Sequence, residues 1–600
     1  MFGYMGQSLR VDLSTGEMQQ KEVDPKQTMP YIGGRGIGIK LLCDTTSAGV
    51  DPLSPENPLI LATGPYTGTG LFSAMFNVTT KSPLTGIAAS SHCGGQWGPK
   101  LKKAGFDGLI ITGAAKTPCY LMIDEGKATI KDAQEIWGQG VFATEEFIRQ
   151  REGGSVQVLG IGQAGENLVR FAAMMNGHRA VGRSGVGAVM GYKKLKAIAV
   201  KGNLPINIHD NKKLAEISRT GSKIALEKGA NFAKHGTPLA FSFFNEKHVL
   251  PTRYFRQGYF EDANQIDAVA LKDRYFVRDL GCYKCPLKCS KIHAVKEGPY
   301  ALSGLEGPEY ETLMALGSGC GNANLESILT ANYLCNDLGM DTISCGNILG
   351  LLMDLCDLGI IGPSQLEGMT FKWGDHAAMI AMIPKIAHRQ GVGNLLAEGS
   401  LAAAAHWGQE ALNRVIHSKK QEFPGYEFRR SFGTGFSLVT SNRGACHLRA
   451  AFYVNEIFLN ECEKGGFENN INLLLDKEHL MAIDDSMAMC KFGQRNAQFT
   501  WPIMADLLTA VTGFHVSADQ LKLTGERIWN LERLYNVREG IEADLPPDRF
   551  LREGLSDGKA GGDALDKERF LKARTLYYQK RGWNDDGHPN PEKLEELGLQ

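Results

Sequence analysis

The sequence lacks any long uninterrupted hydrophobic run. Its longest apolar stretch, NILGLLMDLCDLGIIG, is interrupted by Asp354 and Asp357, so no segment has the roughly 20 apolar residues that a membrane-spanning helix needs. The first residues, MFGYMGQSLRVDLSTGEM, lack a basic segment followed by an apolar one, which is the pattern of a secretory signal. From these absences we expect a cytoplasmic protein without a membrane span.

The sequence also has almost no net charge, because its 65 Lys and Arg residues nearly balance its 66 Asp and Glu residues. A protein that binds nucleic acid or an anionic membrane is expected to carry an excess of positive charge, so we expect neither partner. We find no internal repeat and no low-complexity tract. At 600 residues the chain is too long for one hydrophobic core, and several domains are expected.

Composition predicts an α+β protein, in which an N-terminal β-rich domain is followed by two mainly α-helical domains. Residues 1–208 are rich in glycine and contain short β-like runs at 9–13, 109–111 and 120–123. Helical spacing dominates from 209 onward, and the loop-like stretch FPGY at 423–426 follows a helical region that ends near 418. The predicted domains are therefore 1–208, 209–417 and 418–600, and a surface loop is expected at 556–564.

Two helices are predicted in more detail. One begins at Asp210 or Asn211, either of which is a suitable N-cap residue. The other contains ERIWNLERLYN, which places apolar residues on one helix face: Ile528, Leu531, Leu534 and Tyr535.

Thirteen cysteines are many for a protein of a reducing compartment. Most stand alone in the sequence, and such cysteines are typically small buried side chains. The segment GCYKCPLKC differs, because it holds Cys282, Cys285 and Cys289 on one short stretch. A zinc ribbon would need a second Cys-x2-Cys pair, which the sequence lacks, and a redox dithiol needs only two cysteines. The spacing favours a [4Fe–4S] cluster ahead of zinc, with a fourth thiolate from elsewhere in the chain.

Two glycine-rich segments are candidate phosphate sites. GHRAVGRSGVGAVMG at 177–191 combines backbone N–H groups with Arg179 and Arg183, which suits phosphate binding. A tight turn of a sheet with solvated arginines explains the same pattern equally well. GGRGIGIKLL at 33–42 is a weak match to a dinucleotide fingerprint, because the strand and the acidic residue expected around it are not evident.

Carboxylates and one histidine are the remaining candidates for chemistry. EGPEYE at 306–311 holds three carboxylates, and GACHLR at 444–449 supplies His447. A lone Glu or His is usually structural, so these residues matter only if the fold brings them into one pocket.

A series of segments, in order along the chain, resembles the tungsten-dependent aldehyde:ferredoxin oxidoreductase family nearly end to end. The resemblance rests on GQSLRVDLSTGE, DPLSPENPLILATGPYTGTG, NVTTKSPLTG, GQAGENLVRFAAMMNGHRAVGRSGVGAVMG, KKLKAIAVKG, EGPEYE, LGMDTIS, NRGACH and ERIWNLERLYN. It implies an N-terminal β domain that forms the base for a bis-pterin tungsten cofactor, covered by two helical domains that form a substrate channel. Molybdenum fits the same site, and a Mg²⁺ ion bridging the pterin phosphates is compatible with it.

The resemblance implies that aldehydes are oxidised to carboxylic acids, and that electrons pass through a [4Fe–4S] cluster to ferredoxin or a partner iron–sulfur subunit. It places the fourth cluster ligand at Cys490, the end of DSMAMC. It places cofactor contacts at His92, Gly94, Arg179, Ala180, Gly182, Asn336, Met340, Asp341, Cys446 and Asp485. It implies that Glu311 is the general base, that His447 donates a hydrogen bond to the substrate oxygen and that Tyr310 helps to orient the substrate.

The sequence also departs from the family pattern. Met75 stands where the family often has an arginine that links pterin and cluster, which leaves His92 as a substitute donor. Asn336 replaces an aspartate, and Ala488 replaces a glycine in the segment of the fourth ligand. TANY at 330–333 replaces a Glu-x-x-His motif, so we predict no metal shared between subunits in a homo- or hetero-oligomer.

Two other functions compete with aldehyde oxidation. The changes at Met75 and Asn336 are compatible with the tungsten subunit of a benzoyl-CoA-reductase-type complex, whereas retention of Glu311 and His447 favours an aldehyde oxidoreductase. A non-catalytic electron-transfer protein that uses only the cluster would not need the segments that resemble pterin and phosphate sites.

Overall fold

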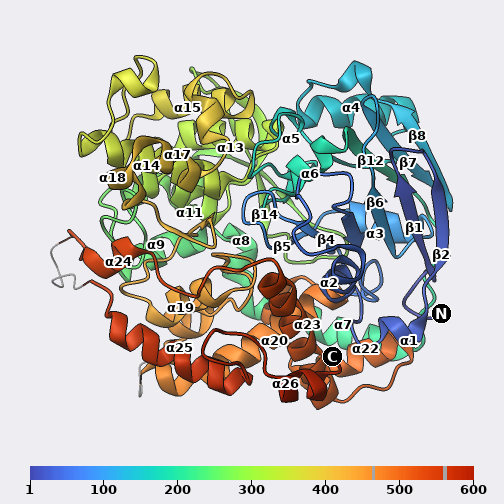
Figure 1. The fold of residues 1–600 in the computed structure, drawn as a ribbon. Coiled ribbons are helices and arrows are strands. Elements are labelled where there is room, and N and C mark those ends of the chain that lie inside the picture. Colours follow the sequence, from blue (N-terminus) through green and yellow to red (C-terminus); the bar gives the residue numbers. More distant parts are fainter. Residues whose placement is uncertain (463–465, 558–563) are drawn as a thin grey trace.

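A computed structural model describes residues 1–462, 466–557 and 564–600 (Figure 1). Two six-stranded sheets form from the first 201 residues, and helices dominate the rest of the chain. The α+β class, with a β-rich part before the helical parts, is therefore confirmed. Most of the surface loop expected at 556–564 lies outside the described residues.

The first sheet has the strand order β2-β1-β6-β3-β4-β5. Its strands are β1 (Gln7–Asp12), β2 (Met18–Glu22), β3 (Leu59–Ala62), β4 (Phe76–Lys81), β5 (Ala88–Cys93) and β6 (Gly108–Thr112). β1 and β6 are parallel, and the other neighbours are antiparallel. Leu9 and Val11 are buried and their neighbours are not, as the alternation in the sequence predicts.

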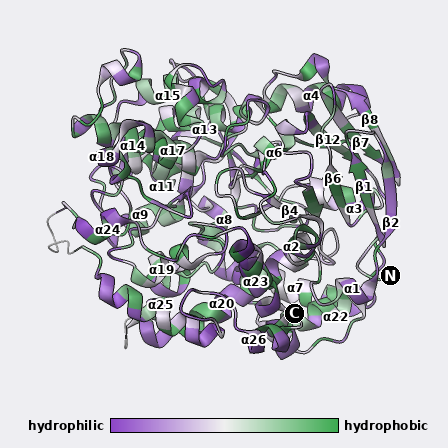
Figure 2. Cartoon of the chain, in the orientation of Figure 1, coloured by the Kyte–Doolittle hydropathy of each residue, from purple (hydrophilic) through white to green (hydrophobic). Residues whose placement is uncertain are grey.

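The second sheet has the order β11-β10-β9-β12-β7-β8. Its strands are β7 (Cys119–Asp124), β8 (Lys127–Asp132), β9 (Gln157–Gly160), β10 (Met174–Asn176), β11 (Arg179–Val181) and β12 (Leu195–Lys201). The hydrophobic faces of these strands pack with those of the first sheet in one core, and Figure 2 shows hydrophobic residues along β6, β7 and β12. Trp97 connects α3 (Trp97–Lys103) to β12 of the second sheet by donating a hydrogen bond to the Ile198 carbonyl at 2.9 Å.

Helices of the β-rich part cover and connect the two sheets. They are α1 (Pro25–Thr28), α2 (Gly34–Thr45), α3 (Trp97–Lys103), α4 (Val141–Glu152), α5 (Gln163–Glu166) and α6 (Val186–Tyr192). The glycines of α2 allow close packing, since an added Cβ would lie 2.2 Å from the Asp485 carbonyl at Gly34 and 2.3 Å from Thr79 Oγ1 at Gly38. This explains the glycine-rich segment at 33–42 without a nucleotide.

The rest of the chain is helical apart from two small sheets. One sheet comprises β13 (Phe276–Leu280), β14 (Ser290–Val295) and β15 (Leu302–Glu306), and the other β16 (His417–Ser418) and β17 (Gln421–Glu422). The helices are α7 (Asn211–Lys228), α8 (Ala230–His235), α9 (Leu239–Glu246), α10 (Ala263–Ile266), α11 (Ala268–Tyr275), α12 (Tyr310–Leu316), α13 (Leu325–Leu338), α14 (Thr342–Asp357), α15 (His376–Ala387), α16 (Val392–Leu396), α17 (Ser400–Trp407), α18 (Gln409–Leu412), α19 (Phe432–Thr440), α20 (Ile471–Met487), α21 (Lys491–Asn496), α22 (Trp501–Thr512), α23 (Ala518–Arg538), α24 (Asp548–Arg552), α25 (Lys567–Arg581) and α26 (Pro591–Leu597).

The expected start of α7 is confirmed, because the Asp210 side chain caps the helix by accepting from the Lys213 N–H at 2.8 Å. α7 packs against α21 and α22, which lie almost 300 residues further along the chain. The helical region expected to run to about 418 ends instead at Leu412, and the β16–β17 hairpin precedes the FPGY loop. The domain boundaries at 208 and 417 stay predictions.

The predicted apolar face of α23 is buried at Ile528, Leu531 and Tyr535. The helix is not amphipathic, however, because Glu532 and Arg533 are buried as well. Glu532 pairs with Arg35 of α2 at 2.5 Å, and Arg533 pairs with Asp544 at 3.1 Å. The middle of α23 is thus buried on more than one face, and its buried charges pair with distant parts of the chain.

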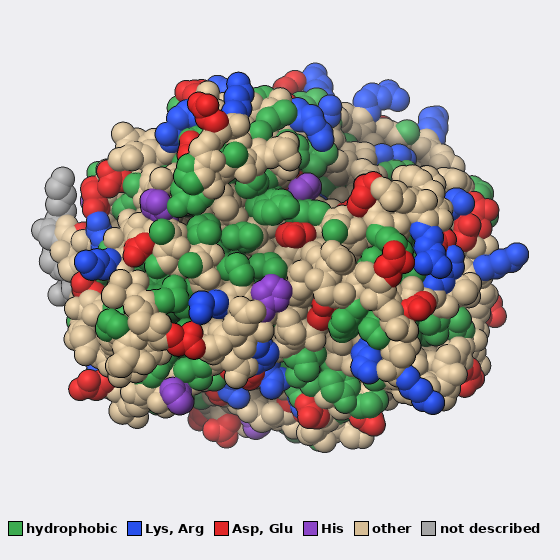
Figure 3. Space-filling view, turned by 90° about the horizontal axis from the view of Figure 1, so that it is seen from above, with side chains coloured by type: hydrophobic (Ala, Val, Ile, Leu, Met, Phe, Trp, Pro, Cys, Tyr) green, Lys and Arg blue, Asp and Glu red, His purple; other side chains and the backbone are tan. Residues whose placement is uncertain are grey.

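Among the described residues, no helix has the length and apolar character needed to cross a membrane. Seen from above, hydrophobic side chains gather across the middle of one face, and charged side chains of both signs lie around them (Figure 3).

Candidate active site and cluster site

A cavity of about 840 Å³ is lined by residues from all three predicted regions. It contains nearly all the predicted site residues, namely His92, Gly94, Arg179, Ala180, Gly182, Cys282, Cys285, Cys289, Tyr310, Glu311, Asn336, Asp341, Cys446, His447 and Cys490. Met340 and Asp485 do not line it but are buried beside it. The fold thus brings together residues that lie almost 400 positions apart in the sequence.

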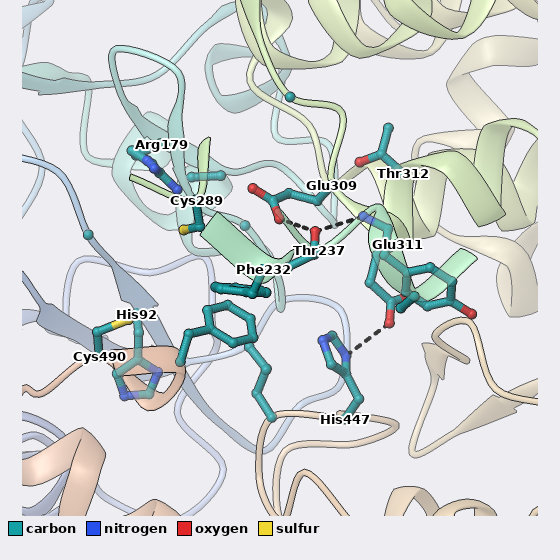
Figure 4. A pocket seen from close by; sticks show the side chains of 18 of the residues that line it. His92, Arg179, Phe232, Thr237, Cys289, Glu309, Glu311, Thr312, His447 and Cys490 are labelled. Carbon is teal, nitrogen blue, oxygen red and sulfur yellow. Dashed lines mark hydrogen bonds and ion pairs between the residues drawn. The ribbon is translucent and has the colours of Figure 1, made fainter. Parts of the chain in front are cut away.

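The three-cysteine segment is the connection between β13 and β14. It packs against the β-rich part just after β5, because the Tyr283 N–H donates to the Gly95 carbonyl at 3.1 Å. Cys490 approaches from α21, whose N-cap it forms, and its N–H donates to the Phe72 carbonyl at 3.1 Å. Figure 4 shows Cys289 and Cys490 on one side of the pocket and Glu311 and His447 on the other.

Cys282, Cys285, Cys289 and Cys490 together form what we call the cysteine corner. Their donor set fits an iron–sulfur cluster. Four cysteine side chains line one end of a single cavity, and all are free thiols. In the described part of the chain, no three His, Cys, Asp or Glu side chains are grouped closely enough to hold a single metal ion. Four cysteine thiolates around one cavity are the donor set that a [4Fe–4S] cluster requires.

Glu311 lies in the first turn of α12, at the opposite end of the cavity. Its Oε2 accepts a hydrogen bond from the Gly425 N–H at 2.8 Å, whereas Oε1 has no hydrogen-bond partner. Burial raises the pKa of Glu311 to about 7, although the Gly425 N–H and Arg183 oppose the shift. The carboxyl group is therefore more easily protonated than that of an ordinary glutamate.

His447 lies beside Glu311 at the same end of the cavity, with Nδ1 3.5 Å from Glu311 Oε1 (Figure 4). Its Nδ1 also has no hydrogen-bond partner. Burial lowers the pKa of His447 well below its usual value, and Arg183 and Arg443 lower it further. A neutral imidazole and an unpartnered carboxylate oxygen thus point into one space, as a site for a polar substrate group requires.

Tyr310 has a different environment from these two residues. Its hydroxyl donates to the Gly425 carbonyl, and an added Cβ at Gly425 would lie 2.9 Å from that hydroxyl. Tyr310 therefore fixes the FPGY loop whose Gly425 N–H binds Glu311, and its ring rather than its hydroxyl is left to face the cavity.

The glycine-rich segment forms a tight hairpin between β10 and β11, with Asn176 paired to Arg179. Arg179 pairs with Glu306 at 2.8 Å, and Ala180 is exposed to the cavity. An added Cβ at Gly182 would meet only Ala180, at 3.6 Å, so the backbone here borders open space. Such a backbone beside a cavity can accept a phosphate group.

Buried cations surround the cavity, and of these Arg443 and Arg449 were not predicted. Arg183 binds Asp341 at 2.9 Å and two backbone carbonyls, so it is not a free phosphate ligand. Arg443 Nη1 lies 3.5 Å from Cys446 Sγ. Although burial opposes the shift, Arg443, Arg449 and Arg183 lower the pKa of the Cys446 thiol. The sequence signal for Arg443 and Arg449 was their position on either side of Cys446 in NRGACHLR.

Asp485 is the centre of a second buried network. Its carboxylate binds Lys491 at 2.7 Å, Arg449 at 3.0 Å and Arg35 at 3.4 Å. His92 Nε2 lies 3.2 Å from the same carboxylate, and burial lowers the pKa of His92 well below its usual value. The nearest polar partner of His92 Nε2 is the Asn77 side-chain amide, at 2.9 Å, and the Asp485 carboxylate lies beside it.

Met75 lies in the cavity wall and leaves no positive charge at that position. Arg179 lies beside Cys289 instead (Figure 4), and it lowers the pKa of the Cys289 thiol against the larger raising effect of burial. A positive charge thus still borders the cysteine corner. Asn336 lines the cavity near Asp341, whose carboxylate caps α14 by accepting from the Ile343 N–H.

Two family models match the chain almost end to end. The model of the aldehyde ferredoxin oxidoreductase N-terminal domain matches residues 8–202, and the model of domains 2 and 3 matches residues 215–599. The chain belongs to the aldehyde ferredoxin oxidoreductase family. The resemblance seen in the sequence motifs is therefore confirmed.

Relatives in this family are similar over their whole length. The chain is 39% identical to the tungsten-containing aldehyde ferredoxin oxidoreductase of Pyrococcus furiosus, covering 100% of this chain and 99% of that protein. It is 38% identical to the protein of the same description from Pyrococcus horikoshii, with 100% of both chains covered. It is 30% identical to the WOR-like subunit of an aliphatic sulfonate oxidoreductase from Pyrococcus furiosus, covering 97% of that protein.

A solved structure shares the fold. It is the active-site complex BamBC of benzoyl coenzyme A reductase, with a TM-score of 0.87 over 100% of this chain and 97% of that chain. At 24% sequence identity, this likeness shows that the aldehyde ferredoxin oxidoreductase fold is shared and carries no argument about the reaction.

Proposed function

We propose that this chain oxidises aldehydes to carboxylic acids and delivers the electrons through a [4Fe–4S] cluster to ferredoxin or a partner iron–sulfur subunit. The observation that carries the proposal is the Glu311–His447 pair, whose unpartnered polar atoms face each other in the cavity that also holds the cysteine corner. Membership of the family and the 39% identical relative support the same activity.

The proposed cofactors are a tungsten bis-pterin group, for which molybdenum is a chemical alternative, one [4Fe–4S] cluster and a Mg²⁺ ion at the pterin phosphates. Cys282, Cys285, Cys289 and Cys490 would hold the cluster. The pterin group would be held by His92, Gly94, Arg179, Ala180, Gly182, Asn336, Met340, Asp341, Cys446 and Asp485, of which Met340 and Asp485 would act from beside the cavity. When bound, the tungsten bis-pterin group supplies the two-electron redox chemistry.

The residues of this chain position the substrate and move protons. In the overall reaction the aldehyde carbon loses its C–H bond and gains a C–O bond from water, two electrons pass singly to the acceptor, and the carboxylate and three protons are released. Glu311 in its ionised form accepts a proton at Oε1, the oxygen that no protein group occupies. His447, kept neutral, donates a hydrogen bond to the substrate oxygen.

We further propose that the protein works in a reducing compartment, in agreement with the expected cytoplasmic location. All thirteen cysteines are free in the described residues, and an assembled thiolate-bound cluster requires reduced cysteines.

Replacement of Glu311 by Gln tests the proposal. E311Q keeps the size of the side chain but cannot accept a proton, so we expect aldehyde turnover to fall by about 100-fold or more while tungsten and iron per chain stay at wild-type levels. E309Q is the matched control, since Glu309 lies two residues away and its carboxylate binds Thr237 instead of facing His447. If E311Q turns over aldehyde at the wild-type rate, Glu311 is not the base.

A further inference from the structure

Aromatic rings line one end of the cavity, next to His447. The Tyr426 and Tyr453 rings are stacked, with centroids 4.8 Å apart and an angle of 24° between their planes. The His447 ring lies 5.8 Å from Tyr426 and 6.3 Å from Tyr453. Phe244 presents its edge to Tyr426 at 5.6 Å, and Phe458 lies 5.1 Å from Phe244. All of these rings line the cavity.

The tyrosine hydroxyls in this wall are already engaged. Tyr310 donates to the Gly425 carbonyl, whereas the Tyr426 and Tyr453 hydroxyls interact with each other and Tyr453 also interacts with Arg495. The wall therefore offers ring faces and edges, and the unpartnered polar atoms beside it belong to Glu311 and His447. A ligand that fits this end has a polar carbonyl group directly attached to an apolar, flat body.

We propose that the substrate is an aromatic aldehyde, whose carbonyl group contacts Glu311 and His447 from the cavity and whose ring packs against Tyr453, Tyr426 and Phe244. None of these three aromatic residues is among those expected to hold the cofactor. Aromatic rings prefer the stacked and edge-to-face arrangements that this wall provides, and a saturated ring of equal size cannot form them. This inference rests on the proposed aldehyde oxidation.

Kinetics with two aldehydes of matched size test the ring site. Benzaldehyde and cyclohexanecarbaldehyde carry the same number of carbon atoms, and only the first is aromatic. With the anaerobically purified holoenzyme and a viologen dye as acceptor, we expect kcat/KM to be about tenfold higher for benzaldehyde, mainly through a lower KM. Equal values for the two aldehydes would overturn the proposal.

Two substitutions at Tyr453 separate the ring from the hydroxyl. Y453L removes the aromatic ring, so the ratio of kcat/KM for benzaldehyde to that for cyclohexanecarbaldehyde should fall to about one. Y453F keeps the ring, and the preference should persist. An equal loss with both aldehydes in Y453L would show that Tyr453 has only a structural role and would contradict the assignment.

Binding of the product acids provides a readout without turnover. Titration calorimetry of the holoenzyme should show benzoate binding about tenfold more tightly than cyclohexanecarboxylate, and Y453L should abolish the difference. If no aldehyde is oxidised but benzoate still binds preferentially, the proposed reaction fails and the aromatic site stands. If aldehydes are oxidised and neither acid is preferred, the reaction stands and the aromatic site fails.

Discussion

At the scale of single residues, the surroundings of Glu311 raise the pKa of its carboxyl group. Burial in α12 raises its pKa to about 7, and the Gly425 N–H and Arg183 prevent a larger shift. Because the folded-state pKa is raised, the carboxylate fraction grows as the pH rises through about 7. A base must be ionised to accept a proton, so activity and ionisation should change together.

The pH dependence of aldehyde oxidation tests this environment. We expect kcat/KM to increase with pH and to level off above about 7, because only the ionised form of Glu311 is active. E309Q should show the same profile. A profile that is already level at about pH 5, close to the ordinary pKa of a glutamate, would contradict the role of Glu311.

Gly94 has no side chain at a position where the backbone lies close to the cysteine corner. Its backbone does not have a positive φ, so an alanine is not strained there, but an added Cβ would lie 3.1 Å from Cys282 Sγ. We expect G94A to displace that sulfur, to lower the iron content per chain and to destabilise the fold by about 1–3 kcal/mol. Iron analysis, EPR of the reduced cluster and thermal unfolding would measure these effects.

The matched control for Gly94 is Gly154, where an added Cβ would meet nothing within 4 Å. G154A should keep wild-type iron content and stability. If G94A also keeps full iron content and an unchanged EPR signal, the close approach of Gly94 to Cys282 does not constrain the cluster site.

At the scale of elements, the junction between α20 and α21 carries both Asp485 and Cys490. α20 ends at Met487 and is capped by Ala488, which adopts φ +60° and whose N–H donates to the Asp484 carbonyl. The sequence alone showed that an alanine replaces the family glycine, but not that the position requires a left-handed backbone. A Cβ in that conformation costs about 1–2 kcal/mol, so this junction is strained at a position next to a proposed cluster ligand.

Replacing Ala488 by Gly should relieve this strain. We expect A488G to raise the free energy of unfolding by about 1 kcal/mol, because glycine adopts the left-handed conformation at no steric cost. The control A482G lies in the interior of the same helix, where Gly lowers stability by about 1 kcal/mol or more. Thermal unfolding would compare the two, and a loss of stability in A488G would contradict the interpretation.

Sequence patterns within one segment correctly predicted features that depend only on neighbouring residues. The alternation in β1 and the Asp210 cap of α7 are both observed. The same reasoning treated α23 as amphipathic, because the partners of Glu532 and Arg533 cannot be seen in a helical repeat. Arg35 and Asp485 lie 450 residues apart in the chain, and only the folded molecule reveals that they form one buried network.

At the scale of the whole molecule, the family resemblance identified more of the candidate site residues than composition did. It selected Cys490 from the isolated cysteines, and the fold places Cys490 in the same cavity as the three-cysteine loop. It did not predict the cations Arg443 and Lys491, nor that Tyr310 is bound to Gly425. These features depend on contacts between the β-rich part and distant helices, to which a motif in one segment gives no clue.

Aldehyde-dependent dye reduction by protein purified anaerobically from cells supplied with tungstate tests the central claim most directly. We expect the viologen dye to be reduced only when an aldehyde is added, with one carboxylate formed for each pair of electrons. Protein that contains tungsten, pterin and iron but reduces no dye with any aldehyde, aromatic or aliphatic, would contradict it.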